Sequence, residues 1–130
     1  MDISFGEWFD KHSTPASIQA NKSSVECALR GMNGGSNHEM FPVSIADKAK
    51  ELGFTYDELK NMTIKTADIE FVNIVNKKGV PIPDGTHHRS SAGRHFHNKL
   101  IEELKLAKSK DEALAIIKKK HDNHMVLKHH

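Results

Sequence analysis

The 130-residue sequence has a single cysteine, Cys27, and no long apolar segment. One cysteine excludes an intramolecular disulfide framework and a cysteine-based zinc site. No hydrophobic run approaches the roughly 18 to 20 residues that a membrane-spanning helix needs. The first ten residues, MDISFGEWFD, lack the basic and apolar regions of a secretory signal, so we expect none.

Hydrophobic residues are also scarce, at 37% of the sequence, and the mean hydropathy is −0.58. The core must therefore be small, and this length suits one domain with one core. We expect a single domain over residues 1–130. Within it we expect a helical segment over 1–31, a site-bearing core over 32–98 and C-terminal helices over 99–130.

Neither sign of charge dominates, since 19 Lys and Arg residues face 17 Asp and Glu residues and give a formal net charge of +2. Nonspecific binders of nucleic acid are usually more basic, whereas +2 suits an enzyme whose basic groups are confined to one cleft. The sequence does contain ten histidines, most of them in its last third. Because imidazole titrates near neutral pH, the charge of this protein depends on pH between about 5 and 8.

Five short patterns predict the starts of helices, because a Ser or Thr side chain there can accept a hydrogen bond from the first turn, or a proline can begin it. They are Ser4–Glu7, Thr14–Pro15, Ser44–Asp47, Thr55–Glu58 and Ser109–Glu112. Gly31 and Gly53 are suited to end the second and third of these helices. In the last helix, the apolar spacing predicts that Leu114, Ile116 and Ile117 face inward.

Two runs rich in β-branched and aromatic residues, 62–66 and 69–75, predict strands. Residues 76–79 have the composition of a turn, and the prolines that follow cannot lie inside a sheet. We expect a polar loop over 84–93 and then a helical stripe that starts at Phe96. The whole pattern predicts an α+β fold with a small central antiparallel sheet of two to four short strands, flanked by N- and C-terminal helices.

The first group of residues with tunable pKa values is His38 and Glu39, directly after the glycine-rich segment 31–37. Glycine has no Cβ, so such a loop lets backbone or substrate approach closely. An imidazole beside a carboxylate is suited to general acid–base catalysis. The pair could equally be an exposed polar dipeptide at the start of a strand, and the dipeptide alone does not distinguish the two interpretations.

A second group is denser, with four imidazoles and two guanidinium groups within residues 86–98. Its members are His87, His88, Arg89, Arg94, His95 and His97. Arginine can donate two hydrogen bonds to phosphate oxygens, and imidazole can move a proton or bind a transition metal. We interpret the segment as a cradle for a phosphodiester, with Arg89, Arg94 and His87 binding the phosphate; the alternative is a solvated basic loop. The two histidines beside Phe96 would share a face in an extended segment but not in a helix.

Three further features carry weaker predictions. Lys65 ends the first predicted strand, where a lysine can stabilise the charge of a phosphoryl transition state or protect an edge strand from aggregation. Asn98 can orient an imidazole or cap a helix. The basic segments 118–121 and 128–130 are expected to form a solvated face or tail that attracts phosphate nonspecifically.

The order of these segments resembles the C-terminal toxin domains of bacterial polymorphic toxins, of the Rhs and contact-dependent inhibition kind. Within that group the sequence is most similar to nuclease domains of the HNH/endonuclease VII type that are named for an Ala-His-His signature. The matching pieces are GGSNHEMFPV at Gly34–Val43, Glu51-Leu52-Gly53, Ile64-Lys65-Thr66, His87-His88-Arg89 and His97-Asn98-Lys99-Leu100, with Glu7-Trp8-Phe9 as a lead-in. One departure is Glu39, which stands where the Ala-His-His pattern has its second histidine.

The resemblance implies a nuclease toxin that hydrolyses the phosphodiester bonds of nucleic acid, DNA rather than RNA, on a ββα-metal (His-Me finger) core. It implies a divalent cation, Mg²⁺ or Zn²⁺, held by Glu39 with one or two of His88, His95 and His97. The predicted metal ligands are Glu39, His88, His95 and His97. The predicted catalytic residues are His38, Glu39, His88, His97 and Lys65, with Asn98 orienting an imidazole. Three arrangements stay open: Glu39 acts as base or ligand, His38 is the base and the later histidines hold the metal, or no metal is used.

The resemblance also implies partners and a place of action. A larger delivery protein would carry the domain at its C-terminus, an acidic immunity protein would block the site, and the effector would act in the cytoplasm of a target bacterial cell. Two other functions fit the residues. One is a metal-independent ribonuclease toxin that uses two histidines and Lys65. The other is a noncatalytic histidine-rich module that binds metal or nucleic acid.

Overall fold

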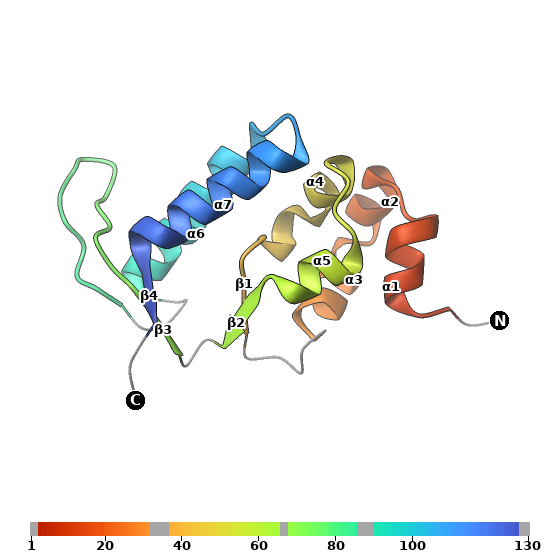
Figure 1. Cartoon of the computed structure of the whole chain (residues 1–130), viewed down its shortest axis with the longest axis horizontal. Helices are drawn as coiled ribbons and strands as arrows, with labels where there is room; N and C mark the ends of the chain where they lie inside the picture. Colours follow the sequence, from red (N-terminus) through yellow and green to blue (C-terminus); the bar gives the residue numbers. More distant parts are fainter. Residues whose placement is uncertain (1–2, 32–36, 66–67, 86–89, 128–130) are drawn as a thin grey trace. The chain divides into compact units, whose positions relative to one another are not determined.

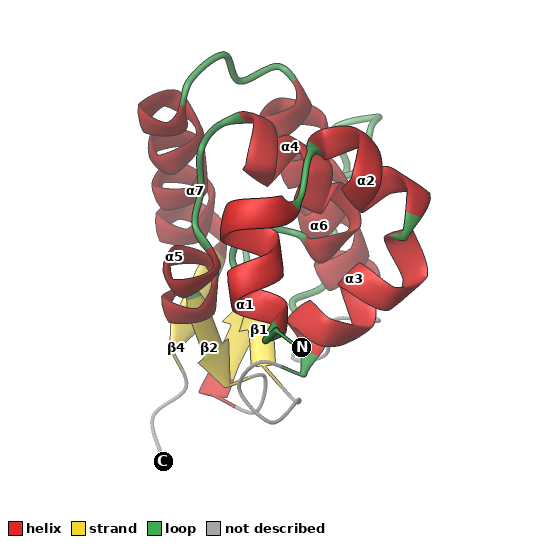
Figure 2. Ribbon diagram, turned by 90° about the vertical axis from the view of Figure 1, so that its right-hand side faces the viewer, coloured by secondary structure: helices red, strands yellow, loops and turns green. Residues whose placement is uncertain are grey.

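The computed structural model describes residues 3–31, 37–65, 68–85 and 90–127. The chain divides into two compact units, Met1–Thr63 and Ile64–His130, which we call the first and the second unit. The fold is α+β, as the sequence predicts, and Figure 2 shows that helices make up most of it. The sequence also predicts one small central sheet. Among the described residues the strands instead form two separate antiparallel pairs.

The first unit is mainly helical. Its helical elements are α1 (Phe5–Glu7), the π-helix η1 (Trp8–His12), α2 (Pro15–Ala20), α3 (Lys22–Arg30), the 3₁₀-helix η2 (Val43–Ile45), α4 (Ala46–Glu51) and α5 (Tyr56–Asn61). Three predicted helix starts are confirmed, because the side-chain oxygens of Ser4, Thr14 and Thr55 each accept a hydrogen bond from a backbone N–H in the first turn. Strand β1 (Asn37–Glu39) pairs with β2 (Thr63–Lys65), which begins at the last residue of this unit.

Two predictions for the first unit are wrong. The Ser44–Asp47 pattern does not cap a helix, because η2 occupies the residues just before α4 and places Ser44 inside that turn. The Ser44 hydroxyl is buried and has no hydrogen-bond partner among the described residues. The single helix predicted to end at Gly31 is divided at Asn21, whose backbone (φ −115°, ψ 31°) is not helical, although Gly31 does end α3.

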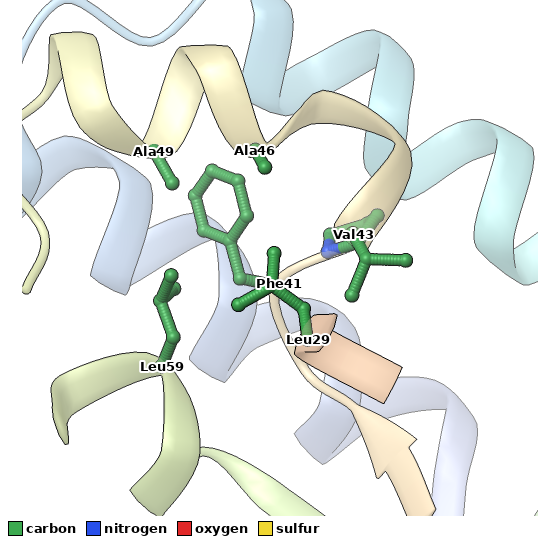
Figure 3. Close-up of a pocket in the computed structure, with 7 residues that line it drawn as sticks. Leu29, Phe41, Val43, Ala46, Ala49 and Leu59 are labelled. Atoms are coloured by element: carbon green, nitrogen blue, oxygen red, sulfur yellow. The ribbon is translucent and has the colours of Figure 1, made fainter. Parts of the chain in front are cut away.

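The core of the first unit forms where the segment after β1 meets the helices. Figure 3 shows the ring of Phe41 lying against Ala46 and Ala49 of α4, with Leu59 of α5 on another side. These side chains and Leu29 of α3 surround a void of only about 10 Å³, so the packing is close. Phe41 is 4% exposed. The strand that carries His38 and Glu39 therefore leads directly into the core.

The second unit is built on a pair of long helices, α6 (Ser91–Lys105) and α7 (Lys110–His124), which lie side by side (Figure 1). Strand β3 (Ile69–Phe71) pairs antiparallel with β4 (Met125–Leu127), which directly follows α7. Between β3 and α6, the N–H of Ile82 donates to the carbonyl of Ile74, and the N–H of Asn76 donates to that of Val80. Gly79 closes this turn with a φ of +79°, a conformation that favours glycine.

The core of this unit is formed by the facing sides of α6, α7 and β3. Phe96 of α6 lies 5.1 Å from Phe71 of β3, measured between ring centroids. The other fully buried side chains here include Ile69, Leu100, Leu104 and Ala113, each 0% exposed. The predicted start of α7 is confirmed, since Ser109 accepts a hydrogen bond from the N–H of Glu112.

The sequence placed three features of the second unit wrongly. Helix α6 begins at Ser91, inside the predicted loop over 84–93, because the Ser90 hydroxyl caps it by accepting from the N–H of Gly93. Leu114 is 37% exposed, because the neighbouring Ala113 takes the inward position. β4 is a strand that the sequence did not predict at all.

No helix in the described part of the chain combines the length and the apolar character that crossing a membrane would require.

Candidate functional site

The predicted site residues are divided between the two units. His38 and Glu39 lie on β1 in the first unit, and Arg94, His95, His97 and Asn98 lie on α6 in the second. Lys65 is exposed at the end of β2. His87, His88 and Arg89 lie outside the described residues. The convergence of the two groups in one cleft therefore stays a prediction, while each group can be described locally.

The β1 group is partly buried, which argues against a merely exposed dipeptide. His38 is 8% exposed, and Glu39 is half-buried. The strand is held beside β2, and just beyond it the N–H of Met40 donates to the carbonyl of Met62 at 2.9 Å. A histidine in this position is protected from bulk water.

Burial also changes the proton affinity of Glu39. The loss of water around its carboxylate raises the pKa above the usual 4.5. A hydrogen bond from its own backbone N–H and the positive charge of Arg30 act in the opposite direction and are smaller. Glu39 therefore keeps its proton to a higher pH than an exposed glutamate, as groups that transfer protons often do.

The α6 group lies on a helix rather than in a loop. His95 and His97 are two positions apart and consequently point to different sides of α6. Asn98 is in the interior of the helix, so a capping role is excluded for it. Arg94 is exposed near the start of α6.

The side of α6 that carries His95 borders a cavity of about 380 Å³, which lies wholly within the second unit. Five residues face it from α6, four of them at helical spacing, two face it from α7, and the segment 74–77 completes its wall. The polar residues among them are Asn76, Lys77, His95, Asn98, Lys99, Glu102, Lys120 and His124. A volume of this size is within the range of small-ligand sites, so the cavity is the best-defined candidate site in the described residues.

Two imidazoles that line the cavity have a defined tautomer. The Nδ1 atom of His95 is 2.8 Å from the carbonyl oxygen of Ser91, and the Nδ1 atom of His124 is 3.3 Å from that of Val72. A carbonyl oxygen only accepts hydrogen bonds, so Nδ1 donates in both cases. In the neutral ring, the nitrogen that can accept a proton is then Nε2. In each neutral ring, Nε2 is therefore the atom that can act as a general base.

Ion pairs position the lysines of the cavity. The ammonium of Lys120 lies 2.8 Å from a carboxylate oxygen of Glu103 on α6, and the Lys120 side chain is only 17% exposed. The ammonium of Lys99 lies 3.8 Å from Glu102 and is well exposed. Lys120 is therefore fixed by burial and pairing, whereas Lys99 can move to meet a ligand.

A divalent metal does not fit the described residues as a resident group. Among them, no three His, Cys, Asp or Glu side chains lie close enough together to hold an ion. Of the predicted ligands, Glu39, His95 and His97 are described and His88 is not.

Sequence reasoning missed Lys120 and His124. It assigned 118–121 to a solvated basic face, and this is wrong for Lys120 and for His121, which is half-buried. Lys120 and His124 are four positions apart, so they lie on one face of α7. That spacing was visible in the sequence, but the partner helix that makes the face significant was not.

Comparison with models of known protein families, with curated protein sequences and with solved structures finds no match to this chain.

Proposed function

We propose that this chain is a nuclease that hydrolyses phosphodiester bonds, with DNA as the preferred substrate and a ββα-type core, as its sequence resemblance implies. The observation that best supports the proposal is the cavity of the second unit, where His95 and His124 have Nε2 as the basic nitrogen beside Lys99 and Lys120. Hydrolysis of a phosphodiester uses these two kinds of group: a base that takes a proton from the attacking oxygen, and cations that bind the phosphate.

In this proposal the residues of the chain divide the work. The Nε2 atom of an imidazole takes a proton from water as the water oxygen attacks phosphorus. The bond from phosphorus to the leaving oxygen breaks, and the imidazolium returns that proton to the leaving oxygen. Lysines bind the phosphate oxygens and stabilise the added negative charge. Glu39, whose pKa is raised by burial, is suited to proton transfer.

A specific observation favours the alternative, a metal-independent ribonuclease. Two imidazoles and at least one lysine line a single cavity, and cleavage of RNA needs only these groups. One imidazole would take the proton of the 2′-hydroxyl and another would protonate the leaving oxygen. In this version Lys120 replaces the predicted Lys65, which is exposed at the end of β2.

Cleavage of supercoiled plasmid and of single-stranded RNA by the purified chain, each with and without EDTA, tests the proposal. We expect cleavage of plasmid, and a loss of about 100-fold or more when His95→Gln removes the base. The matched control is His12→Gln, an exposed histidine of the first unit, which should keep full activity. Cleavage of RNA alone that resists EDTA would favour the ribonuclease. A folded protein that cleaves neither substrate would contradict both and favour a noncatalytic binding module.

The toxin role carries two further proposals. A larger delivery protein bears the domain and brings it to the cytoplasm of a target bacterium, and an acidic immunity protein covers the basic site. A pull-down from the producing cell with the His95→Gln variant as bait would identify the immunity protein, because the inactive variant can be expressed without its protector.

A further inference from the structure

The cavity beside α6 and α7 has one apolar side. Ile74 and Phe96 are buried at 6% and 3% exposure, and Val75, which also lines it, is 54% exposed. The exposed side chain of Val75, next to two buried apolar side chains, provides an apolar surface on which a planar ring of a ligand can pack. Apolar walls of this kind contact planar rings in ligand sites.

Lysine side chains make another part of the cavity wall positively charged. Lys77, Lys99 and Lys120 line the cavity, against the carboxylates of Glu102, which lines it, and Glu103, which pairs with Lys120. With neutral imidazoles these five groups sum to a charge of about +1, so the site favours an anion. An ammonium group is a common partner of a phosphate oxygen.

The imidazoles of His95 and His124 can accept hydrogen bonds from a ligand. With Nδ1 bound to a backbone carbonyl, the neutral rings of His95 and His124 present Nε2 as an acceptor. Asn98, on the same face of α6 as His95, both donates and accepts. A ligand that satisfies them needs hydroxyl or amino groups as well as an anion.

From these three properties together we propose that the cavity binds one nucleotide, with its phosphate at Lys99 and Lys120 and its base against the exposed Val75, beside Ile74 and Phe96. The hydroxyl or amino groups of the nucleotide donate to the two imidazoles. This inference rests on the proposed function, since it assigns the place where that nuclease holds one unit of its substrate. It gives Lys99, Lys120 and His124 specific roles, whereas the sequence had assigned Lys120 only a nonspecific attraction to phosphate and had assigned no role to Lys99 or His124.

Calorimetric titration of the full chain with AMP tests the proposal, because a mononucleotide has no internucleotide bond to cleave. We expect saturable binding of one AMP, with adenosine and inorganic phosphate each binding more weakly. Lys99→Met should weaken AMP binding about tenfold, since it removes one charged hydrogen bond. Its exposed pair with Glu102 contributes little to folding, so this variant should fold normally. Lys120→Met should also weaken AMP binding. Because it removes the partner of Glu103, this variant can also lose stability, so Lys99→Met is the sharper test.

The matched control is Lys118→Met on α7, a lysine that is 78% exposed, pairs with Asp122 and does not line the cavity. It should leave AMP binding unchanged. Absence of AMP binding, or equal binding by the Lys99 and Lys118 variants, would overturn the inference. The cleavage assay separates the two proposals. Cleavage without AMP binding keeps the nuclease and removes the nucleotide site, whereas AMP binding without cleavage does the reverse.

Discussion

The surroundings of His121 shift the pKa of its imidazole. Its ring lies edge-on to Phe96, with 5.0 Å between ring centroids, and its Nδ1 atom is 2.7 Å from the carbonyl oxygen of Ile117. Burial lowers the pKa of this imidazole below 6.5; the hydrogen bond to Ile117 and the charge of Asp122 oppose that effect only in part. The folded protein therefore favours neutral His121.

This pKa shift predicts acid sensitivity. Because the unfolded chain binds the proton more tightly, the contribution of His121 to stability is complete above about pH 6.5 and is lost as pH falls toward its folded pKa. Urea unfolding of the wild type and of His121→Gln between pH 7.5 and 5 measures it. The wild type should lose more stability on acidification than the variant.

Exposed His12 supplies the control for this prediction, since His12→Gln should leave the acid response of the wild type unchanged. Identical pH dependence of the wild type and the His121 variant would show that another group controls the response.

At the scale of the element, two helix starts that look alike in sequence differ in structure. In α5 the Thr55 hydroxyl accepts from the N–H of Glu58 at 3.2 Å, and the Glu58 carboxylate accepts from the N–H of Thr55 at 2.9 Å. Ser44 makes no such bond with a described residue. We expect Thr55→Ala to lower the free energy of unfolding by about 1 kcal/mol.

Ser44→Ala is the matched comparison. It removes a buried hydroxyl with no partner among the described residues, so it should be neutral or slightly stabilising. Equal destabilisation by the two substitutions, measured by urea unfolding at pH 7, would mean that the caps are not different in solution.

The same elements show how far sequence reasoning reaches. Starts fixed by local hydrogen bonds, at Ser4, Thr14, Thr55 and Ser109, could be predicted, because the cap and its partner lie within a few residues of each other. β4 could not, since Met125–Leu127 is too short for any periodicity and exists as a strand only because β3 lies beside it. Tertiary pairing, rather than local propensity, decides that segment.

The candidate site divides in the same way. The sequence singled out His95 and Asn98 by their density of polar groups, and both line the cavity. It did not find Lys120 or His124, because these residues of α7 line a cavity only through the packing of α7 against α6, which the sequence does not show.

At the scale of the whole molecule, a formal charge of only +2 limits how the chain can bind nucleic acid. If the basic residues of the cavity make the contacts, about three phosphates are neutralised. The logarithm of the affinity for duplex DNA should then fall with the logarithm of salt concentration with a slope of about −2 to −3. Fluorescence anisotropy with the His95→Gln variant, which should not cleave the probe, measures this slope.

Adding Lys99→Met to that variant should reduce the slope by about 1, while adding Lys118→Met should leave it unchanged. A slope much steeper than about −5 would mean that basic residues far from the cavity dominate the binding. It would count against a confined site.

The pairing of β3 with β4 also sets an order of events during translation. Val72, beside β3, exchanges hydrogen bonds with His124, 52 positions later in the chain. At about 5–20 residues per second, a ribosome needs about 3 to 10 seconds to make the intervening segment. Throughout that interval β3 has no β4 to pair with, so the strand edge that β4 covers in the folded protein stays unpaired until α6 and α7 have been made.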